Sequence, residues 1–213
     1  MEAQLATLLD RAIDAGDSPA VDDDATRTRI LDAALDEAAQ VGLERLTVEG
    51  VVRRVGLGRM TVYRRFARRD DLVEALIVRE GKRFLAAVAA GLESEAEPHD
   101  RLAGGFVAAM RFARDHPMLE RLAHSDPGSV TATVAANDAL LLDMGAEFIA
   151  RTIVGENPDV SSGAARRVAD LLARLFLTYI ALPPSDPDPH DDAALRAFGR
   201  DVLAPFAESA LQT

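Results

Sequence analysis

Residues 46–72 read LTVEGVVRRVGLGRMTVYRRFARRDDL, and this stretch decides the expected fold. Thr47 can cap a short helix over 48–55, because a threonine hydroxyl accepts a hydrogen bond from a free backbone N–H of the first turn. Gly56 ends that helix, since glycine adopts the left-handed conformation of a tight turn without strain. A second helix begins two or three residues later. Two short helices joined by a sharp, glycine-containing turn form a helix-turn-helix unit.

The second helix of this unit has two chemically different faces. Val62 and Phe66, four residues apart, share one face and are expected to be buried. Guanidinium groups can bind guanine O6 and N7 in the major groove of DNA, and hydroxyl groups reach phosphates. The remaining positions of the helix are left to point outward, and all but Met60 carry a guanidinium or a hydroxyl group: Arg59, Met60, Thr61, Tyr63 and Arg64. The pattern favours a helix that enters the major groove.

Charge is distributed unevenly along the chain. The 213 residues include 35 acidic and 24 basic side chains, and a net charge of −11 opposes binding to nucleic acid. Between 53 and 69 there is no acidic residue but a series of arginines, namely Arg53, Arg54, Arg59, Arg64, Arg65, Arg68 and Arg69. A basic segment on an acidic chain is typical of a localised site for a polyanion. A solvated charged face is the alternative, and charge by itself does not decide between the two.

A longer segment around the unit matches a known pattern. The first helix opens with Ile30-Leu31-Asp32-Ala33-Ala34, and residues 61–66 have the form Thr-x-Tyr-x-x-Phe. Together with 46–72, these residues resemble the DNA-binding signature of the TetR family of bacterial repressors. The resemblance covers about residues 26–76, and it implies a helix-turn-helix domain that binds a DNA operator.

The resemblance also implies a role for individual side chains. Arg59, Met60 and Arg64 would face base edges. Thr61 and Tyr63 would hold the recognition helix on the DNA backbone. Thr47 and Arg69 would contact phosphates from outside that helix. Arg69 stands where the family usually has lysine.

The chain departs from the family pattern at two helix starts. Gly58 replaces the usual serine cap of the recognition helix, which costs only tenths of a kcal/mol. Arg68 replaces the usual serine cap of the next helix, and a positive charge there opposes the helix dipole. Asp70 is then an alternative cap that would move the start of this helix, and with it the position of Arg69.

The rest of the chain also has the period of helices. From Thr26 onward no run of alternating β-branched residues occurs, and glycines and prolines divide the chain into about nine helices. The predicted class is all-α, with a three-helix helix-turn-helix domain followed by a helical domain. Three parts are expected: an acidic, loosely attached extension over 1–24, the DNA-binding domain over 25–72, and a ligand-binding and dimerisation domain over 73–213.

The C-terminal part contains a candidate pocket for a small molecule. A long helix expected over 130–153 has an apolar face that Asn137 interrupts with an amide, and a buried amide needs a hydrogen-bond partner. A bound ligand, a backbone carbonyl or a trapped water would each serve. Methionine and aromatic side chains suit a flexible apolar pocket, although ordinary core is the alternative for each of them. The predicted ligand-binding residues are Phe106, Met110, Asn137, Met144 and Phe148.

Two further long helices are expected over 162–182 and 191–212. Each has a wide apolar stripe that must be buried. In the TetR family the last two helices pair with those of a second copy, so the resemblance implies a homodimer. A two-fold axis would also place two recognition helices on half-sites roughly 34–36 Å apart, as a palindromic operator requires.

Several function classes lack their characteristic residues. The chain has no cysteine, its four histidines are scattered, and no serine occupies a Gly-x-Ser-x-Gly elbow. Neither an enzyme, a metal site nor a cofactor is therefore expected. No apolar run reaches the roughly 20 residues that cross a bilayer, and the first residues lack the basic and apolar segments of a secretory signal. A cytoplasmic protein without membrane contact is the expectation.

The predicted function is a DNA-binding transcriptional regulator, in the family's commoner mode a repressor, that binds a palindromic operator as a dimer. A small hydrophobic effector would release it by shifting the helix near 100–115 against the helix over 70–88. The alternative is a protein–protein adaptor whose basic segment binds an acidic partner. Affinity for DNA that falls steeply with salt would distinguish the regulator from the adaptor.

Overall fold

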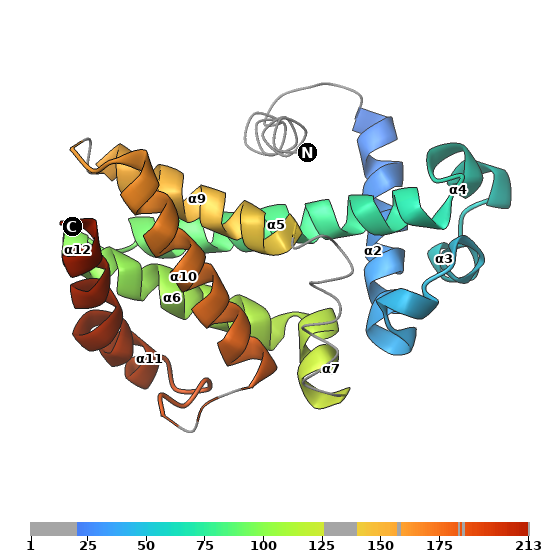
Figure 1. Ribbon diagram of the computed structural model, residues 1–213. Coiled ribbons are helices and arrows are strands. Elements are labelled where there is room, and N and C mark those ends of the chain that lie inside the picture. The colour runs from blue at the N-terminus through green and yellow to red at the C-terminus, as the bar shows by residue number, and fades with distance from the viewer. Residues whose placement is uncertain (1–20, 126–139, 157–158, 183, 185, 213) are drawn as a thin grey trace. The chain divides into compact units, whose positions relative to one another are not determined.

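The computed structural model describes residues 21–125, 140–156, 159–182, 184 and 186–212. Every regular element in these ranges is a helix and none is a strand, which confirms the all-α prediction (Figure 1). The chain divides into two compact units, Met1–Lys82 and Arg83–Thr213. The break lies inside the long helix α5 (Arg69–Glu93), whereas the predicted boundary follows residue 72.

The first described helix, α2 (Val21–Val41), has a fully buried stripe at Ile30, Ala34 and Ala38. These residues follow the spacing of four that places side chains on one helix face. Gly42 ends the helix with a φ of 88°, a conformation that a residue with a Cβ adopts only with strain.

The start of α2 corrects one expectation. The acidic extension was expected to reach residue 24, but the helix already begins at Val21. Residues 1–20 lie outside the described part of the chain.

The helix-turn-helix unit has the bounds that the sequence indicates. A short 3-10 turn, η1 (Leu43–Arg45), leads into α3 (Val48–Val55), and α4 (Arg59–Arg65) follows after three residues. The hydroxyl oxygen of Thr47 accepts a hydrogen bond from the backbone N–H of Gly50 at 3.0 Å, so the predicted cap is confirmed. Gly56 has a φ of 67°, which confirms the left-handed turn.

Side chains from α2, α3, α4 and α5 form the core of the first unit. Its largest members that are essentially inaccessible to solvent are Ile30, Leu46, Val51, Val62, Leu72 and Leu76. Burying a side chain of this size stabilises a fold by roughly 1.5–3 kcal/mol. The shared core therefore fixes the angle between α3 and α4, and with it the surface that they present together.

The start of α5 decides between the two caps proposed from the sequence. The helix begins at Arg69, so Arg68 occupies the cap position and Asp70 lies in the first turn. The idea that Asp70 takes over as cap is wrong. Its carboxylate instead pairs with the flanking arginines, at 3.8 Å from Arg68 and 3.4 Å from Arg69, and its charge favours the helix dipole from within the first turn.

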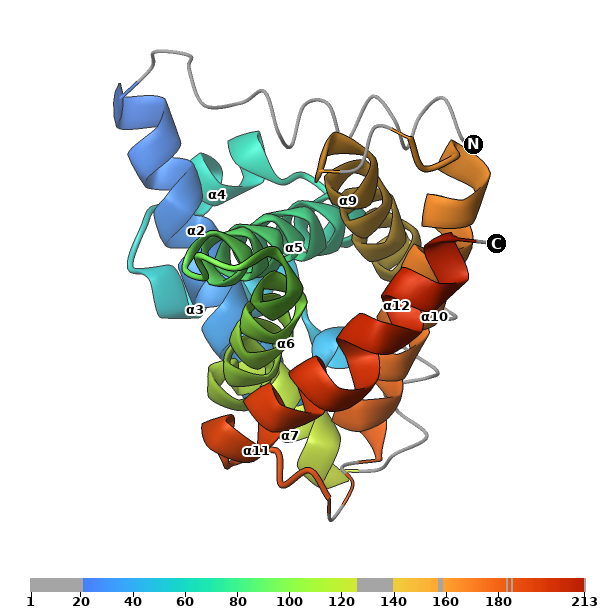
Figure 2. The same cartoon turned by 90° about the vertical axis from the view of Figure 1, so that its left-hand side faces the viewer.

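The second unit contains the remaining helices of the described ranges. They are α6 (Pro98–Asp115), α7 (Pro117–Ser125), α9 (Leu140–Glu156), α10 (Ser162–Ala181), α11 (Asp192–Phe198), the π-helical turn η2 (Gly199–Leu203) and α12 (Ala204–Leu211). Figure 2 shows α10 alongside α9 and α12. A cluster of small side chains allows the α9–α10 contact to be close, and it consists of Ala146, Ala150, Ala165, Ala169 and Ala173.

The last helix is interrupted in a way that the sequence analysis did not predict. A single helix was expected over 191–212, but a π-helical turn at 199–203 separates α11 from α12. Proline at 205 lacks an N–H and its ring crowds the carbonyl four residues earlier, which is a sufficient cause for a local change of helix type. Within this turn, a Cβ on Gly199 would lie 2.6 Å from the Cα of Ala103, so only glycine allows this approach to α6.

Candidate DNA-binding surface

Helix α4 presents the two faces that its sequence predicts. Val62 is fully buried and Phe66 is 2% exposed, which anchors the inner face in the core. On the outer face Arg59 and Arg64 are exposed, and the side chain of Met60 is 79% exposed. The apolar surface of this methionine is not buried within the domain, and it is therefore available for contact with another molecule.

Thr61 and Tyr63 lie at the border between these faces and are half-buried. Partial burial limits the motion of these two side chains, and it leaves their hydroxyl groups within reach of a second molecule. Thr47, which precedes α3, is exposed, and its oxygen already accepts the capping bond from Gly50. A hydroxyl that accepts one hydrogen bond can still donate its own hydrogen. The Thr47 cap is thus compatible with a second bond to a phosphate.

Arg69 has a structural role that the sequence analysis missed. Its guanidinium donates to three backbone carbonyls, those of Leu46 at 3.0 Å, Leu43 at 2.9 Å and Glu44 at 3.2 Å. These carbonyls lie in and directly after η1, and the planar guanidinium donates to several of them at once. Arg69 therefore joins the start of α5 to the turn before α3.

A small polar network links α3 to α4. The phenol of Tyr63 donates a hydrogen bond to the carboxylate of Glu49, and the guanidinium of Arg59 lies 3.6 Å from the same carboxylate. The Arg59 guanidinium is also 5.2 Å from the centroid of the Tyr63 ring, within the range of a cation–π contact. The sequence analysis treated Glu49 only as a first-turn acid and did not predict this network.

The network changes the proton affinity of its members. The hydrogen bond from Tyr63, aided by nearby arginines, lowers the pKa of Glu49, so this carboxylate is charged at neutral pH. The same hydrogen bond raises the pKa of Tyr63, because loss of the phenolic proton would place two negative charges together. Tyr63 therefore remains a hydrogen-bond donor at physiological pH.

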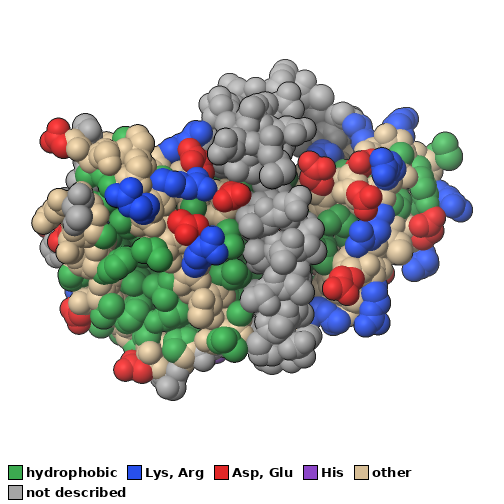
Figure 3. All heavy atoms as spheres, viewed as in Figure 1, with side chains coloured by type: hydrophobic (Ala, Val, Ile, Leu, Met, Phe, Trp, Pro, Cys, Tyr) green, Lys and Arg blue, Asp and Glu red, His purple; other side chains and the backbone are tan. Residues whose placement is uncertain are grey.

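The arginines of the basic segment fall into two groups. Arg54 on α3 is held by α2, where it pairs with Glu37 at 2.8 Å and donates to Gln40 at 2.6 Å. Arg53 and Arg64 are exposed, and neither forms an ion pair with another residue of the described ranges. Basic side chains gather around α3 and α4 in Figure 3. Arg53 is thus a further candidate for contact with a polyanion, beyond the residues assigned from the sequence.

The comparisons with known proteins concern this same segment. Residues 30–76 match the family model described as bacterial regulatory proteins, tetR family. Over 149 residues, which are 70% of this chain and 73% of its relative, the sequence is 25% identical to an uncharacterised HTH-type transcriptional regulator of Mycobacterium tuberculosis. Residues 30–76 therefore form a DNA-binding domain of the TetR type.

Solved structures share the whole architecture. The TetR family repressor AlkX from a Dietzia strain, implicated in biodegradation of n-alkanes, superposes with a TM-score of 0.64 at 20% identity, over 86% of this chain and 98% of AlkX. SmeT in its complex with triclosan gives 0.60 at 19% identity, over 85% of this chain and 91% of SmeT. These likenesses show that the fold of TetR-family regulators extends through the C-terminal helices.

The matched domain and the named relatives identify the protein as a helix-turn-helix transcriptional regulator of the TetR type. The family consists of regulators and not of enzymes, in agreement with the expectation from the sequence. Within the described ranges, no helix combines the length and the apolar character needed to cross a membrane.

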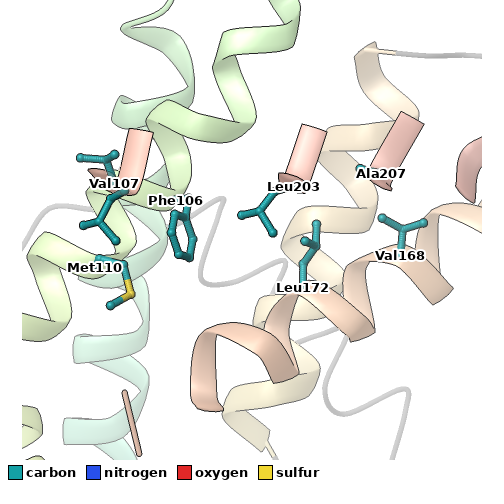
Figure 4. Packing of buried hydrophobic residues seen from close by; sticks show 8 residues of the cluster. Phe106, Val107, Met110, Val168, Leu172, Leu203 and Ala207 are labelled. Atoms are coloured by element: carbon teal, nitrogen blue, oxygen red, sulfur yellow. The ribbon is translucent and has the colours of Figure 1, made fainter. Parts of the chain in front are cut away.

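The residues predicted from the sequence to bind an effector are only partly brought together. Phe106 and Met110 on α6 belong to one buried cluster with side chains of α10 and α12, which face them in Figure 4. The ring of Phe106 lies 5.8 Å from that of Tyr179. Met144 is buried and Phe148 half-buried on α9, and neither is a member of that cluster. Asn137 lies outside the described residues.

Proposed function

We propose that the protein is a dimeric repressor that binds a palindromic operator and is released by a small hydrophobic effector. The observation that carries this proposal is the outer face of α4, where Arg59, Arg64 and the 79%-exposed Met60 stand together on a rigid helix. A DNA-binding regulator acts where the chromosome lies, so we infer a cytoplasmic location. The proposed functional parts are a DNA-binding domain at 25–72 and a regulatory domain at 73–213.

On the operator, each group of side chains has a chemically distinct task. Arg59, Met60 and Arg64 contact base edges in the major groove, where a guanidinium can bind guanine in a bidentate manner. Thr61 and Tyr63 hold the helix on the sugar–phosphate backbone. Thr47 and Arg69 contact phosphates on either side of the recognition helix, in addition to their bonds within the domain. Phosphate contacts set the register, and base contacts set the sequence preference.

A second copy is the proposed partner of the last two helices. Leu171 on α10 is 52% exposed, Val202 in η2 is 48% exposed and Phe206 on α12 is 45% exposed. Figure 3 shows apolar side chains gathered on this face of the second unit. Large exposed apolar patches mark interaction surfaces. A two-fold interface here would give the symmetric pair of recognition helices that a palindrome requires.

The buried cluster around Phe106 and Met110 supports a hydrophobic effector. Methionine and aromatic side chains can repack around ligands of different shapes. The solved neighbours point in the same direction, since SmeT binds triclosan and AlkX is linked to n-alkanes. An effector releases the operator only through its higher affinity for the state that fits DNA poorly, and a coupling of about 1–3 kcal/mol would suffice.

Selection of bound fragments from random duplex DNA, using the purified full chain, tests the proposal. The expected product is an inverted repeat whose half-sites are centred roughly 34–36 Å apart, with affinity that falls steeply as salt rises. Enrichment of no sequence and no affinity for any duplex in dilute buffer would contradict it. Salt-dependent binding to an acidic protein together with no binding to DNA would instead favour an adaptor.

A further inference from the structure

Glu49 is an acidic side chain within the basic surface formed by α3 and α4. Its side chain is 54% exposed, and it contacts Tyr63 and Arg59, two of the groups that the proposed function assigns to DNA. A carboxylate offers charged oxygens to a guanidinium and to a phenolic O–H, as a DNA phosphate does. In the free protein, therefore, Glu49 occupies the partners that DNA would use.

We propose that Glu49 is an internal competitor of DNA phosphate, which lowers the affinity of the free protein for duplex DNA. The proposal rests on the proposed function of α4. It extends that function by naming a residue of the helix before the recognition helix that limits how tightly DNA is bound.

The exposure of the contact makes the competition reversible. The side chain of Arg59 is 69% exposed, and ion pairs so open to water are weak. The Arg54–Glu37 pair behaves differently, because its side chains are only 29% and 14% exposed and its partners join α2 to α3. DNA can therefore displace Glu49 from Arg59 and Tyr63 without disturbing the domain, whereas displacement of Glu37 would break a contact between helices.

Displacement has the same cost on every duplex. At any sequence, Arg59 and Tyr63 must give up the carboxylate, and the freed charge of Glu49 then lies beside the phosphates. At the operator, contacts with base edges add affinity, but they do not change the cost of displacing Glu49. Glu49 therefore lowers the affinity for operator and non-operator DNA by about the same factor.

The test compares Glu49→Gln with a matched control in the full chain. Glu74 on α5 is exposed and forms no hydrogen bond or ion pair with another described residue, so Glu74→Gln removes the same charge from the same unit. Fluorescence anisotropy with a random-sequence duplex and with the selected operator is recorded over a range of salt concentrations.

Glu49→Gln should bind the random duplex about five- to ten-fold more tightly, with about one more counterion in the salt slope. Its affinity for the operator should rise by about the same factor, so the specificity ratio stays unchanged. Glu74→Gln should change both affinities by less than about two-fold, because Glu74 holds none of the proposed DNA-binding side chains. Equal tightening by the two variants, unchanged binding by Glu49→Gln, or weaker binding of the random duplex would each overturn the proposal.

A measurement without DNA tests the contact itself. In a Tyr179→Phe background Tyr63 is the only tyrosine, and Glu49→Gln should move the pKa of its phenol down toward the ordinary value. A wild-type chain that binds no duplex overturns both the proposed function and the competitor. A wild-type chain that binds the operator, paired with a Glu49→Gln variant that leaves the affinity for both duplexes or the Tyr63 pKa unchanged, overturns the competitor alone.

Discussion

The guanidinium of Arg69 donates to the carbonyl oxygen of Leu46 at 3.0 Å, across 23 residues of sequence. The bond connects the first turn of α5 to the segment that precedes α3. The bond gives Arg69 a structural role within the domain, whereas the family resemblance implies that the same side chain contacts a phosphate of DNA. Both roles use the same guanidinium, and they can be separated by experiment.

Arg69→Lys should destabilise the protein by about 1 kcal/mol, because an ammonium cannot satisfy several carbonyls in the planar arrangement of a guanidinium. Urea unfolding measures the change. Arg68→Lys is the control, since Arg68 is exposed and makes only a 3.8 Å ion pair with Asp70. Unchanged stability of Arg69→Lys, together with weaker binding to every duplex, would show that phosphate contact is the main role of Arg69.

Two substitutions on α4 should affect DNA binding in different ways. Arg64→Ala should cost about 1–3 kcal/mol on the operator and relax the preference at one base pair. Tyr63→Ala should weaken binding to all duplexes to a similar extent, because its hydroxyl is assigned to the backbone. Binding isotherms on the operator and on single-base variants measure both effects. An equal loss on every sequence for both variants would refute the base contact of Arg64.

Phe206→Glu should convert the dimer to a monomer without unfolding the chain. Phe206 is 45% exposed in the single chain, so the substitution disturbs no internal core, but it would bury an unpaired charge in the proposed interface. Sedimentation should show a monomer, and affinity for the palindrome should fall by about 100-fold as the second half-site is lost. Phe206→Leu keeps an apolar side chain and should remain dimeric. A dimeric Phe206→Glu protein would exclude this face as the interface.

Stability at acidic pH should depend on Asp192 at the start of α11. The hydrogen bond from Arg111, with Nε 2.8 Å from the carboxylate, lowers the pKa of Asp192 below its ordinary value of about 3.9. A lowered pKa means that the folded state binds the proton less readily than the unfolded state does. The contribution of Asp192 is therefore complete above the ordinary pKa and is lost as pH falls through the folded-state value.

The difference in unfolding free energy between wild type and Asp192→Asn should thus be constant near neutral pH and shrink between about pH 5 and pH 2. Urea unfolding at several pH values measures it. A difference that stays constant down to the lowest pH would show that the carboxylate does not use its charge in the folded state.

Much of the helix-turn-helix unit could be predicted because its signals are local. The Thr47 cap, the left-handed Gly56 and the buried pair Val62 and Phe66 depend on residues within a few positions of each other. The interruption before α12 was missed although proline at 205 is visible in the sequence. A proline shows that the helix must change near it, but whether the chain kinks, ends or forms a π turn depends on the approach of Gly199 to α6.

The sequence by itself determined where α3 and α4 begin and end, and which face of α4 carries arginines. Capping, glycine turns and apolar spacing act within one or two helical turns, so the order of residues is sufficient for them. Only the tertiary structure decided the partners of those arginines. Glu49 meets Tyr63 across 14 residues, and Arg69 meets Leu46 across 23. Such contacts depend on the angle at which the helices cross, and packing of the shared core sets that angle.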